Sequence, residues 1–164
     1  MTKFTKLALA STLLTSALYA QNTKHVHIGV STANIEGEDY AEFNIGYGVN
    51  GYFNSFLLGT SFDFAYGTPK VNGKSIDVAT ASVDFRLGYG LFDNKLSIYA
   101  IGTGAFQGVD GTDGAGFGYG GGINYDITDN FAINLEYKTY DMKTGSSTVN
   151  YTYEKSNLNL KYRF

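Results

Sequence analysis

Cysteine and tryptophan are absent from the 164-residue sequence, and proline occurs once. Without cysteine, no disulfide can hold the fold together, even in an oxidising compartment. Lysine and arginine (12) are fewer than aspartate and glutamate (15). This acidic balance argues against a nucleic-acid partner, because phosphate binding needs clustered cations. After the first twenty residues, no stretch approaches the roughly 18 apolar residues of a membrane helix. Glycine (21), tyrosine (14) and phenylalanine (12) are abundant instead.

The first twenty residues have the order of a secretory signal peptide. Two lysines lie within the first six residues, an uncharged apolar or small stretch follows over residues 7–17, and Ala20 ends a segment that fits a cleavage site. This apolar stretch is too short to span a bilayer as a helix, and its flanks are typical of export signals. We therefore expect residues 1–20 to be a cleaved signal peptide and residues 21–164 to form a single domain. The alternative is a buried N-terminal helix. Cleavage would remove two lysines and no acid, so the mature chain would be more acidic than the full sequence, whose net charge is −3.

Eight segments of the remaining chain alternate large apolar side chains with polar or small ones at a period of two. In the first segment, for example, Val26 and Ile28 lie on one face, and His25 and His27 lie on the other. This alternation is typical of β-strands with one apolar and one polar face. The segment over 96–107 leaves its facing open, since large apolar residues occur in both phases. The predicted strands are about 25–34, 40–50, 55–66, 76–90, 96–107, 116–127, 131–141 and 150–164.

The connections between these segments alternate in length. Short turns alternating with longer loops are typical of outer-membrane barrels, and favour one over a soluble sandwich or a lipocalin-like barrel. In hydrocarbon, every backbone N–H and C=O must be paired within the protein, and a closed sheet achieves this. The sequence therefore predicts an all-β fold: an eight-stranded antiparallel transmembrane β-barrel, an up-and-down meander with an interior filled by side chains. The short connections are near 50–54, 91–95 and 128–130, and the longer ones are near 67–75, 108–115 and 142–149, with a shorter first loop at 35–39.

The polar faces of the predicted strands include charged residues in mid-strand. Four acids and four bases share the inward phase, so their signs are matched. Because an unpaired buried charge is costly, the match predicts a structural network of salt bridges. The alternative is an ion-selective lumen or a gate. The predicted network comprises Glu42, Asp63, Asp84, Arg86, Glu136, Lys138, Lys161 and Arg163. Arg86 is expected to meet Asp84, Asp63 or a charge across the lumen, and Lys161 and Arg163 are expected to meet Glu136, with Glu42 as a further partner.

Three features could suggest chemistry, and each has a simpler explanation. His25 and His27 are the only histidines, but the first strand starts on the periplasmic side, so both lie near the wrong leaflet for a lipid-modifying enzyme. No cysteine and no third histidine support a metal at this pair. Residues 116–121 match GxGxxG, yet a dinucleotide site needs that motif between a strand and a helix. Residues 110–114 lack the spacing of a calcium loop. We therefore predict no catalytic residue, no cofactor and no metal.

Two segments resemble the eight-stranded OmpA/OmpX-type outer-membrane barrels: residues 116–137, GFGYGGGINYDITDNFAINLEY, and the C-terminal LNLKYRF. Such barrels often have a Gly-rich strand, a tight turn and a strand ending in Glu-Tyr, and they commonly end in Phe. The resemblance implies that the outer-membrane assembly machinery recognises the last strand through Leu158, Leu160, Tyr162 and Phe164. Unlike full-length OmpA, the sequence is expected to have no peptidoglycan-binding domain after the barrel. Without tryptophan, tyrosine and phenylalanine must form any interfacial belt.

These observations predict a non-enzymatic integral protein of the Gram-negative outer membrane, with a charge-plugged interior and surface-exposed loops. Its expected role is structural or surface-interacting. A narrow porin-like channel for small ions or solutes is the first alternative, and a lipid A-modifying enzyme is the second. The expected partners are outer-membrane lipid and lipopolysaccharide, the assembly machinery and periplasmic chaperones, and the expected oligomeric state is a monomer.

Overall fold

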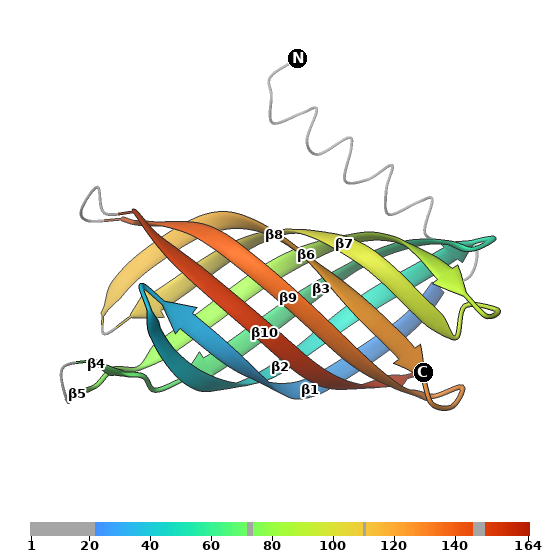
Figure 1. Ribbon diagram of the computed structural model, residues 1–164, viewed down its shortest axis with the longest axis horizontal. Coiled ribbons are helices and arrows are strands. Elements are labelled where there is room, and N and C mark those ends of the chain that lie inside the picture. Colours follow the sequence, from blue (N-terminus) through green and yellow to red (C-terminus); the bar gives the residue numbers. More distant parts are fainter. Residues whose placement is uncertain (1–21, 72–73, 110, 146–149) are drawn as a thin grey trace, which may run out of the picture.

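The computed structural model describes residues 22–71, 74–109, 111–145 and 150–164. The expected signal peptide, residues 1–20, lies outside the described residues. Eight long strands close into one barrel, and two short strands form a small hairpin beside it (Figure 1). The barrel strands are β1 (Asn22–Ile35), β2 (Glu38–Phe53), β3 (Phe56–Gly67), β6 (Val78–Leu91), β7 (Leu96–Val109), β8 (Thr112–Asp126), β9 (Phe131–Thr144) and β10 (Asn150–Arg163), and the hairpin is β4 (Lys70–Val71) with β5 (Lys74–Ser75).

Each barrel strand pairs antiparallel with the barrel strands before and after it in the chain, and β10 closes the barrel on β1. The closing ladder runs from His25 opposite Arg163 to Ile35 opposite Tyr153. Closure gives every barrel strand two neighbours, so the barrel sheet has no unpaired edge. The predicted eight-stranded antiparallel meander is therefore confirmed.

The predicted longer loop at 108–115 is wrong. The ladder of β7 and β8 continues to Val109 opposite Thr112, so only residues 110–111 connect the two strands. Gly111 has a φ of 80°, a value that glycine adopts without strain. The segment is polar and lacks apolar alternation, a composition that predicts a loop. Backbone pairing does not need apolar side chains where strands extend past the apolar layer.

Two other connections also differ from simple loops. Residues 36–37 form a two-residue turn in which both φ values are positive, 51° at Glu36 and 94° at Gly37, as in the type I′ turns that suit the twist of a hairpin. The long connection between β3 and β6 contains the hairpin of β4 and β5, with Lys70 opposite Ser75. In Figure 1 the hairpin lies beyond the ends of β3 and β6, away from the C-terminus.

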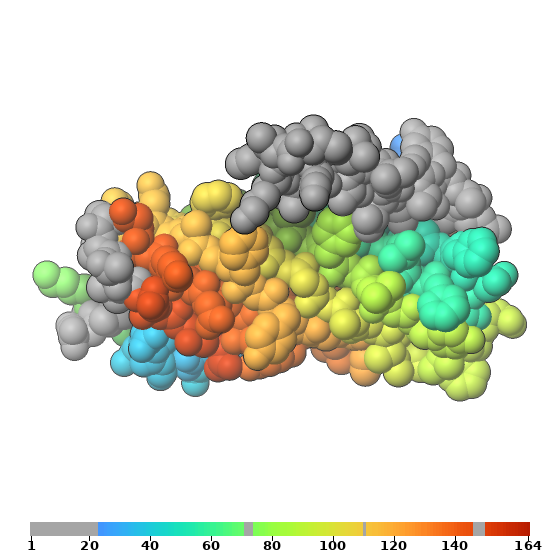
Figure 2. All heavy atoms as spheres, turned by 90° about the horizontal axis from the view of Figure 1, so that it is seen from above, coloured from blue at the N-terminus to red at the C-terminus, as the bar shows by residue number. Residues whose placement is uncertain are grey.

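The connections divide between two ends of the barrel. The terminal end holds the start of β1, the C-terminus, and the short connections 54–55, 92–95 and 127–130. The loop end holds the other four connections, including the β4–β5 hairpin (Figure 1). The space-filling view shows the β2–β3 and β6–β7 connections side by side at the terminal end (Figure 2).

The outer wall of the barrel is a band of exposed apolar side chains. Among them, Ile28 is 49% exposed, Ile45 48%, Phe85 45% and Leu160 45%. The inward residues of the same strands are mostly polar or charged and buried. In water such an outer wall would be unfavourable, whereas in lipid it is the expected surface. The described residues include no helix long and apolar enough to cross a bilayer.

The structure settles the facing of the ambiguous strand, β7. Ile98 and Phe106 point outward and are 51% and 73% exposed, whereas Tyr99 and Ile101 are buried in the interior. The outward phase of β7 continues through small residues, among them Gly102. Because β7 has glycines on its outer face and large residues on its inner face, its sequence does not show the apolar alternation of the other strands.

Candidate functional site: the charged barrel interior

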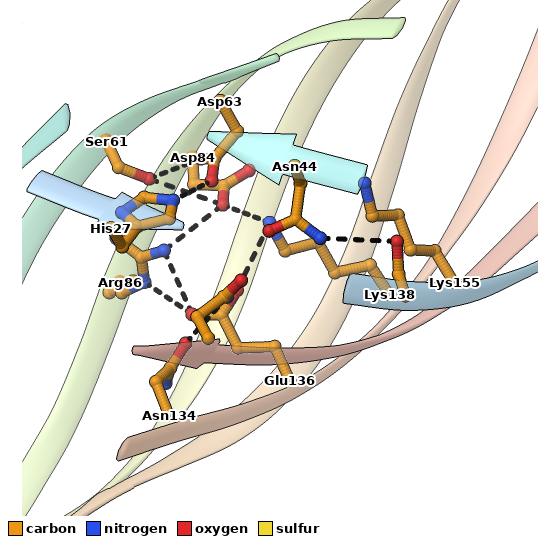
Figure 3. Close-up of polar contacts among 12 residues, drawn as sticks. His27, Asn44, Ser61, Asp63, Asp84, Arg86, Asn134, Glu136, Lys138 and Lys155 are labelled. Carbon is orange, nitrogen blue, oxygen red and sulfur yellow. Dashed lines mark hydrogen bonds and ion pairs between the residues drawn. The ribbon is translucent and has the colours of Figure 1, made fainter. Parts of the chain in front are cut away.

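The centre of the barrel contains a cluster of alternating acids and bases from β6 and β9 (Figure 3). Inward positions two residues apart place Asp84 and Arg86 on β6, and Glu136 and Lys138 on β9. The Arg86 guanidinium donates to Glu136 Oε1 through Nε at 3.0 Å, and its Nη2 lies 2.9 Å from the same oxygen. Arg86 Nη2 also lies 3.4 Å from Asp84 Oδ2. Lys138 Nζ contacts Asp84 Oδ2 and lies 3.3 Å from Glu136 Oε2.

A second group, from β1 and β3, adjoins this cluster. His27 Nε2 lies 2.6 Å from Asp63 Oδ1, and Ser61 Oγ donates to Asp63 Oδ2 at 2.6 Å. The histidine ring occupies the space above Gly46 on β2, where an added Cβ would lie 2.4 Å from His27 Nε2. The glycine therefore provides the room in which the ring reaches Asp63.

Tyr99 on β7 joins the centre of the barrel to the polar residues of β9 and β10. Its hydroxyl donates to Glu136 Oε1 at 2.8 Å and accepts a hydrogen bond from Asn134 Nδ2. Asn159 Nδ2 donates to Asn134 Oδ1 at 3.2 Å. Glu136 is thus held by groups from three different strands, β6, β7 and β9.

A separate cluster around Glu42 lies nearer the loop end of the interior. The Glu42 carboxylate accepts hydrogen bonds from Tyr40 at 2.9 Å and from Tyr153 at 2.8 Å, and Lys155 Nζ lies 3.1 Å from Glu42 Oε2. Tyr153 stacks on Tyr140 with ring centroids 5.2 Å apart. Lys155 and the tyrosines were not predicted as site residues. The period of two, extended back along β10 from Asn157, would have found Lys155 and Tyr153.

The bases near the C-terminus do not have the partners expected for them. Arg163 pairs with Asp126, and Lys161 Nζ has no partner among the described residues. The register explains this difference. Glu136 lies opposite Asn157, six residues along β10 from Arg163, or about 20 Å at 3.3 Å per residue.

The structure places seven of the eight predicted network residues in the buried interior, and Arg163 half-buried at the terminal end. Histidines 25 and 27 are also buried and point inward, in the half of β1 nearest the terminal end. The GxGxxG match at 116–121 lies within β8.

No group of three or more histidine, cysteine or acidic side chains that could hold a metal occurs in the part of the chain that the structure describes. The predicted C-terminal recognition residues are all exposed on the outer wall: Leu158, Leu160, Tyr162 and Phe164.

A closed antiparallel barrel with an apolar wall and a charged interior defines an integral β-barrel protein of the bacterial outer membrane. The comparisons with known proteins agree. Residues 6–164 match the family model described as the outer membrane protein beta-barrel domain, and the chain belongs to this family. A comparison with curated proteins finds no match.

Several solved structures share the fold at low sequence identity. Neisserial surface protein A (NspA) has a TM-score of 0.63 at 10% identity, with 87% of this chain and 97% of that chain covered. Ail, the attachment invasion locus protein of Yersinia pestis, has a TM-score of 0.53 at 18% identity, with 87% and 97% covered. OprG from Pseudomonas aeruginosa has a TM-score of 0.53 at 12% identity, with 88% and 96% covered. The predicted family, barrel architecture and outer-membrane location are confirmed.

Proposed function

We propose that this protein is a non-enzymatic outer-membrane barrel whose interior is closed by paired charges, and that its role is structural and surface-interacting. The observation that supports this most strongly is the bridge formed by Arg86 and Glu136 between β6 and β9, with Lys138 and Asp84 beside it. These side chains come from strands that are not neighbours, so their contacts cross the lumen. A conducting path would have to pass between them.

The loop-end cluster supports a second closure of the same lumen. Glu42 and Lys155 pair below a layer of buried apolar and aromatic side chains that includes Tyr140, Met142 and Val78. A layer of this kind excludes water more effectively than ion pairs alone. The interior is thus blocked first by packing at the loop end and then by charge at the centre.

Surface contacts in this proposal are made by the longer connections at the loop end, of which the structure describes the β4–β5 hairpin, because the connections at 36–37 and 110–111 are too short to form a binding loop. Ail has been solved in complex with the heparin analogue sucrose octasulfate. A polyanion of that kind fits this chain poorly. The described exposed charges near the loop end are mostly acidic, namely Glu36, Glu38, Asp39, Asp77, Asp113 and Asp141, against Lys70, Lys74 and Lys143.

The partners in this proposal are outer-membrane lipid and lipopolysaccharide around the apolar band, and the assembly machinery and periplasmic chaperones during export. No nucleic acid takes part, and the protein acts as a monomer. The exposed apolar ridge of Leu158, Leu160, Tyr162 and Phe164 is the segment that the assembly machinery would recognise.

Conductance across a planar bilayer tests the closed lumen against the narrow channel. We expect the purified, refolded protein to insert without steady openings, and its heat-modifiable gel mobility verifies that the inserted material is folded. Reproducible single-channel steps would refute the closed lumen and support the porin-like alternative.

Lipid A analysis tests the enzymatic alternative. We expect the mass spectrum of lipid A to be unchanged when the protein is overexpressed. A new lipid A species that disappears in the His25→Ala or His27→Ala variant would overturn the non-enzymatic proposal.

A further inference from the structure

One buried ammonium group in the barrel has no protein partner. Lys161 is 2% exposed, and its Nζ makes no hydrogen bond or ion pair with any residue that the structure describes. Glu136 and Asp63 act electrostatically on Lys161, but each acid described in the interior has another basic partner at salt-bridge distance. These pairs are Glu42 with Lys155, Asp63 with His27, Asp84 with Lys138, Glu136 with Arg86, and Asp126 with Arg163.

Two further nitrogens near Lys161 are unpartnered. Arg86 Nη1 and His25 Nε2 are buried, in side chains 1% exposed, and neither has a hydrogen-bond partner in the described chain. Lys161 lies opposite His27 in the β1–β10 ladder, and the rings of His27 and His25 are 5.9 Å apart. Arg86 acts electrostatically on both Lys161 and His25. The three groups therefore share one region of the interior.

This arrangement is unfavourable unless something offsets it. A buried cation without a partner is strongly unfavourable, and a buried polar atom in a native protein is normally hydrogen-bonded. Here an ammonium, one end of a guanidinium and an imidazole nitrogen all lack acceptors in the same region. All three can donate an N–H, so a partner for them must be an acceptor, and a negatively charged acceptor would also offset the charge of Lys161.

We propose that Lys161, Arg86 and His25 form a binding site for a small inorganic anion, such as a halide, inside the barrel. Lys161 supplies the charge, and Arg86 Nη1 and His25 Nε2 supply further N–H donors. The anion enters from the terminal end, because the Glu42 cluster and the layer around Tyr140 close the loop end. The site differs from a channel, since one end of the lumen is closed. Water alone around Lys161 is the competing explanation.

Chloride-dependent stability of the full chain, refolded in detergent micelles, tests this proposal. The unfolding temperature is measured in sodium gluconate with increasing replacement by sodium chloride or bromide at constant ionic strength. We expect a saturable rise of about 3 °C, because a ligand that binds the folded state stabilises it by mass action. In Lys161→Met the rise should disappear, and in Lys161→Arg it should persist. Lys155→Met is the matched control, since it removes another buried interior lysine but should leave the chloride dependence unchanged.

Bromide binding to the unmodified protein gives a second measurement that needs no variant to fold. We expect an anomalous scattering peak next to Lys161 Nζ in crystals grown with bromide. The proposal is overturned if that position shows only water, or if the unfolding temperature rises equally in the Lys161→Met variant and the unmodified chain. Conductance does not enter either test, so the outcome is separate from that of the closed-lumen experiment.

Discussion

Replacing Arg86 with methionine gives the sharpest test of the central charge cluster. The change removes contacts of 3.0 and 2.9 Å to Glu136 and one of 3.4 Å to Asp84. It leaves Glu136 with Tyr99 at 2.8 Å and Lys138 at 3.3 Å. Two buried carboxylates then share one lysine. Removing one partner of a buried ion pair costs about 3–5 kcal/mol, a large fraction of the roughly 5–15 kcal/mol of a typical domain.

The paired change separates charge imbalance from lost packing. Glu136→Met alone should also cost about 3–5 kcal/mol, because Arg86 and Lys138 would then share Asp84. With both residues changed to methionine, Lys138 and Asp84 remain as a balanced pair. The double variant should therefore be more stable than the sum of the single effects predicts, by about 3 kcal/mol.

Urea unfolding of the refolded protein in lipid vesicles measures these free energies. Lys24→Met, at an exposed position, is the control and should change stability by less than about 0.5 kcal/mol. If the two single effects simply add in the double variant, Arg86 and Glu136 do not stabilise each other. The network would then be a set of independently hydrated charges, and the proposed closed lumen would lose its main support.

Three further predictions follow from other parts of the barrel. Gly46→Ala should cost about 1–3 kcal/mol, because its Cβ would lie 2.4 Å from a buried histidine nitrogen, whereas Gly102→Ala, with no atom within 4 Å, should be neutral in the same urea assay. Phe85→Arg should cost about 2–4 kcal/mol in vesicles, because Phe85 lies on the outer wall in mid-strand, and Phe85→Leu should be tolerated. Phe164→Ala should reduce the amount of folded barrel in outer membranes, while the rate of refolding in detergent stays unchanged. If the refolding rate in detergent also fell, the variant would have a folding defect instead of lost recognition by the assembly machinery.

The strands and their facing could be predicted from the sequence because the lipid and the interior impose opposite chemistry on alternate residues. The rule failed where that contrast is weak. On β7, Gly102 faces outward while Tyr99 and Ile101 face inward, so large apolar residues occur in both phases and the sequence leaves the facing open. At 108–115 the strands extend past the apolar layer, and polar composition was interpreted as a loop.

The members of the interior site were largely predictable, but their pairing was not. An inward phase identifies a charged residue from sequence spacing alone, and the same rule would have found Lys155. The partner of each charge depends on strand tilt and register, which sequence spacing does not give. Asp63 meets His27 from a strand that is not its neighbour, and Arg163 meets Asp126 instead of Glu136.

The interior charges have a further consequence for how the sequence specifies one barrel. A slip of one residue between strands would turn every apolar side chain inward, so the alternation alone excludes it. A slip of two residues keeps all faces correct, and the apolar band cannot distinguish it from the native register. Such a slip of β9 would move Glu136 and Lys138 by about 7 Å relative to Arg86 and Asp84. It would break the 2.9 Å contact between Arg86 and Glu136 and the contact between Lys138 and Asp84. Several buried charges would then be unpaired at once, at a cost of several kcal/mol each. The outer wall thus sets the phase of the strands, and the ion pairs across the lumen select among the registers that share that phase.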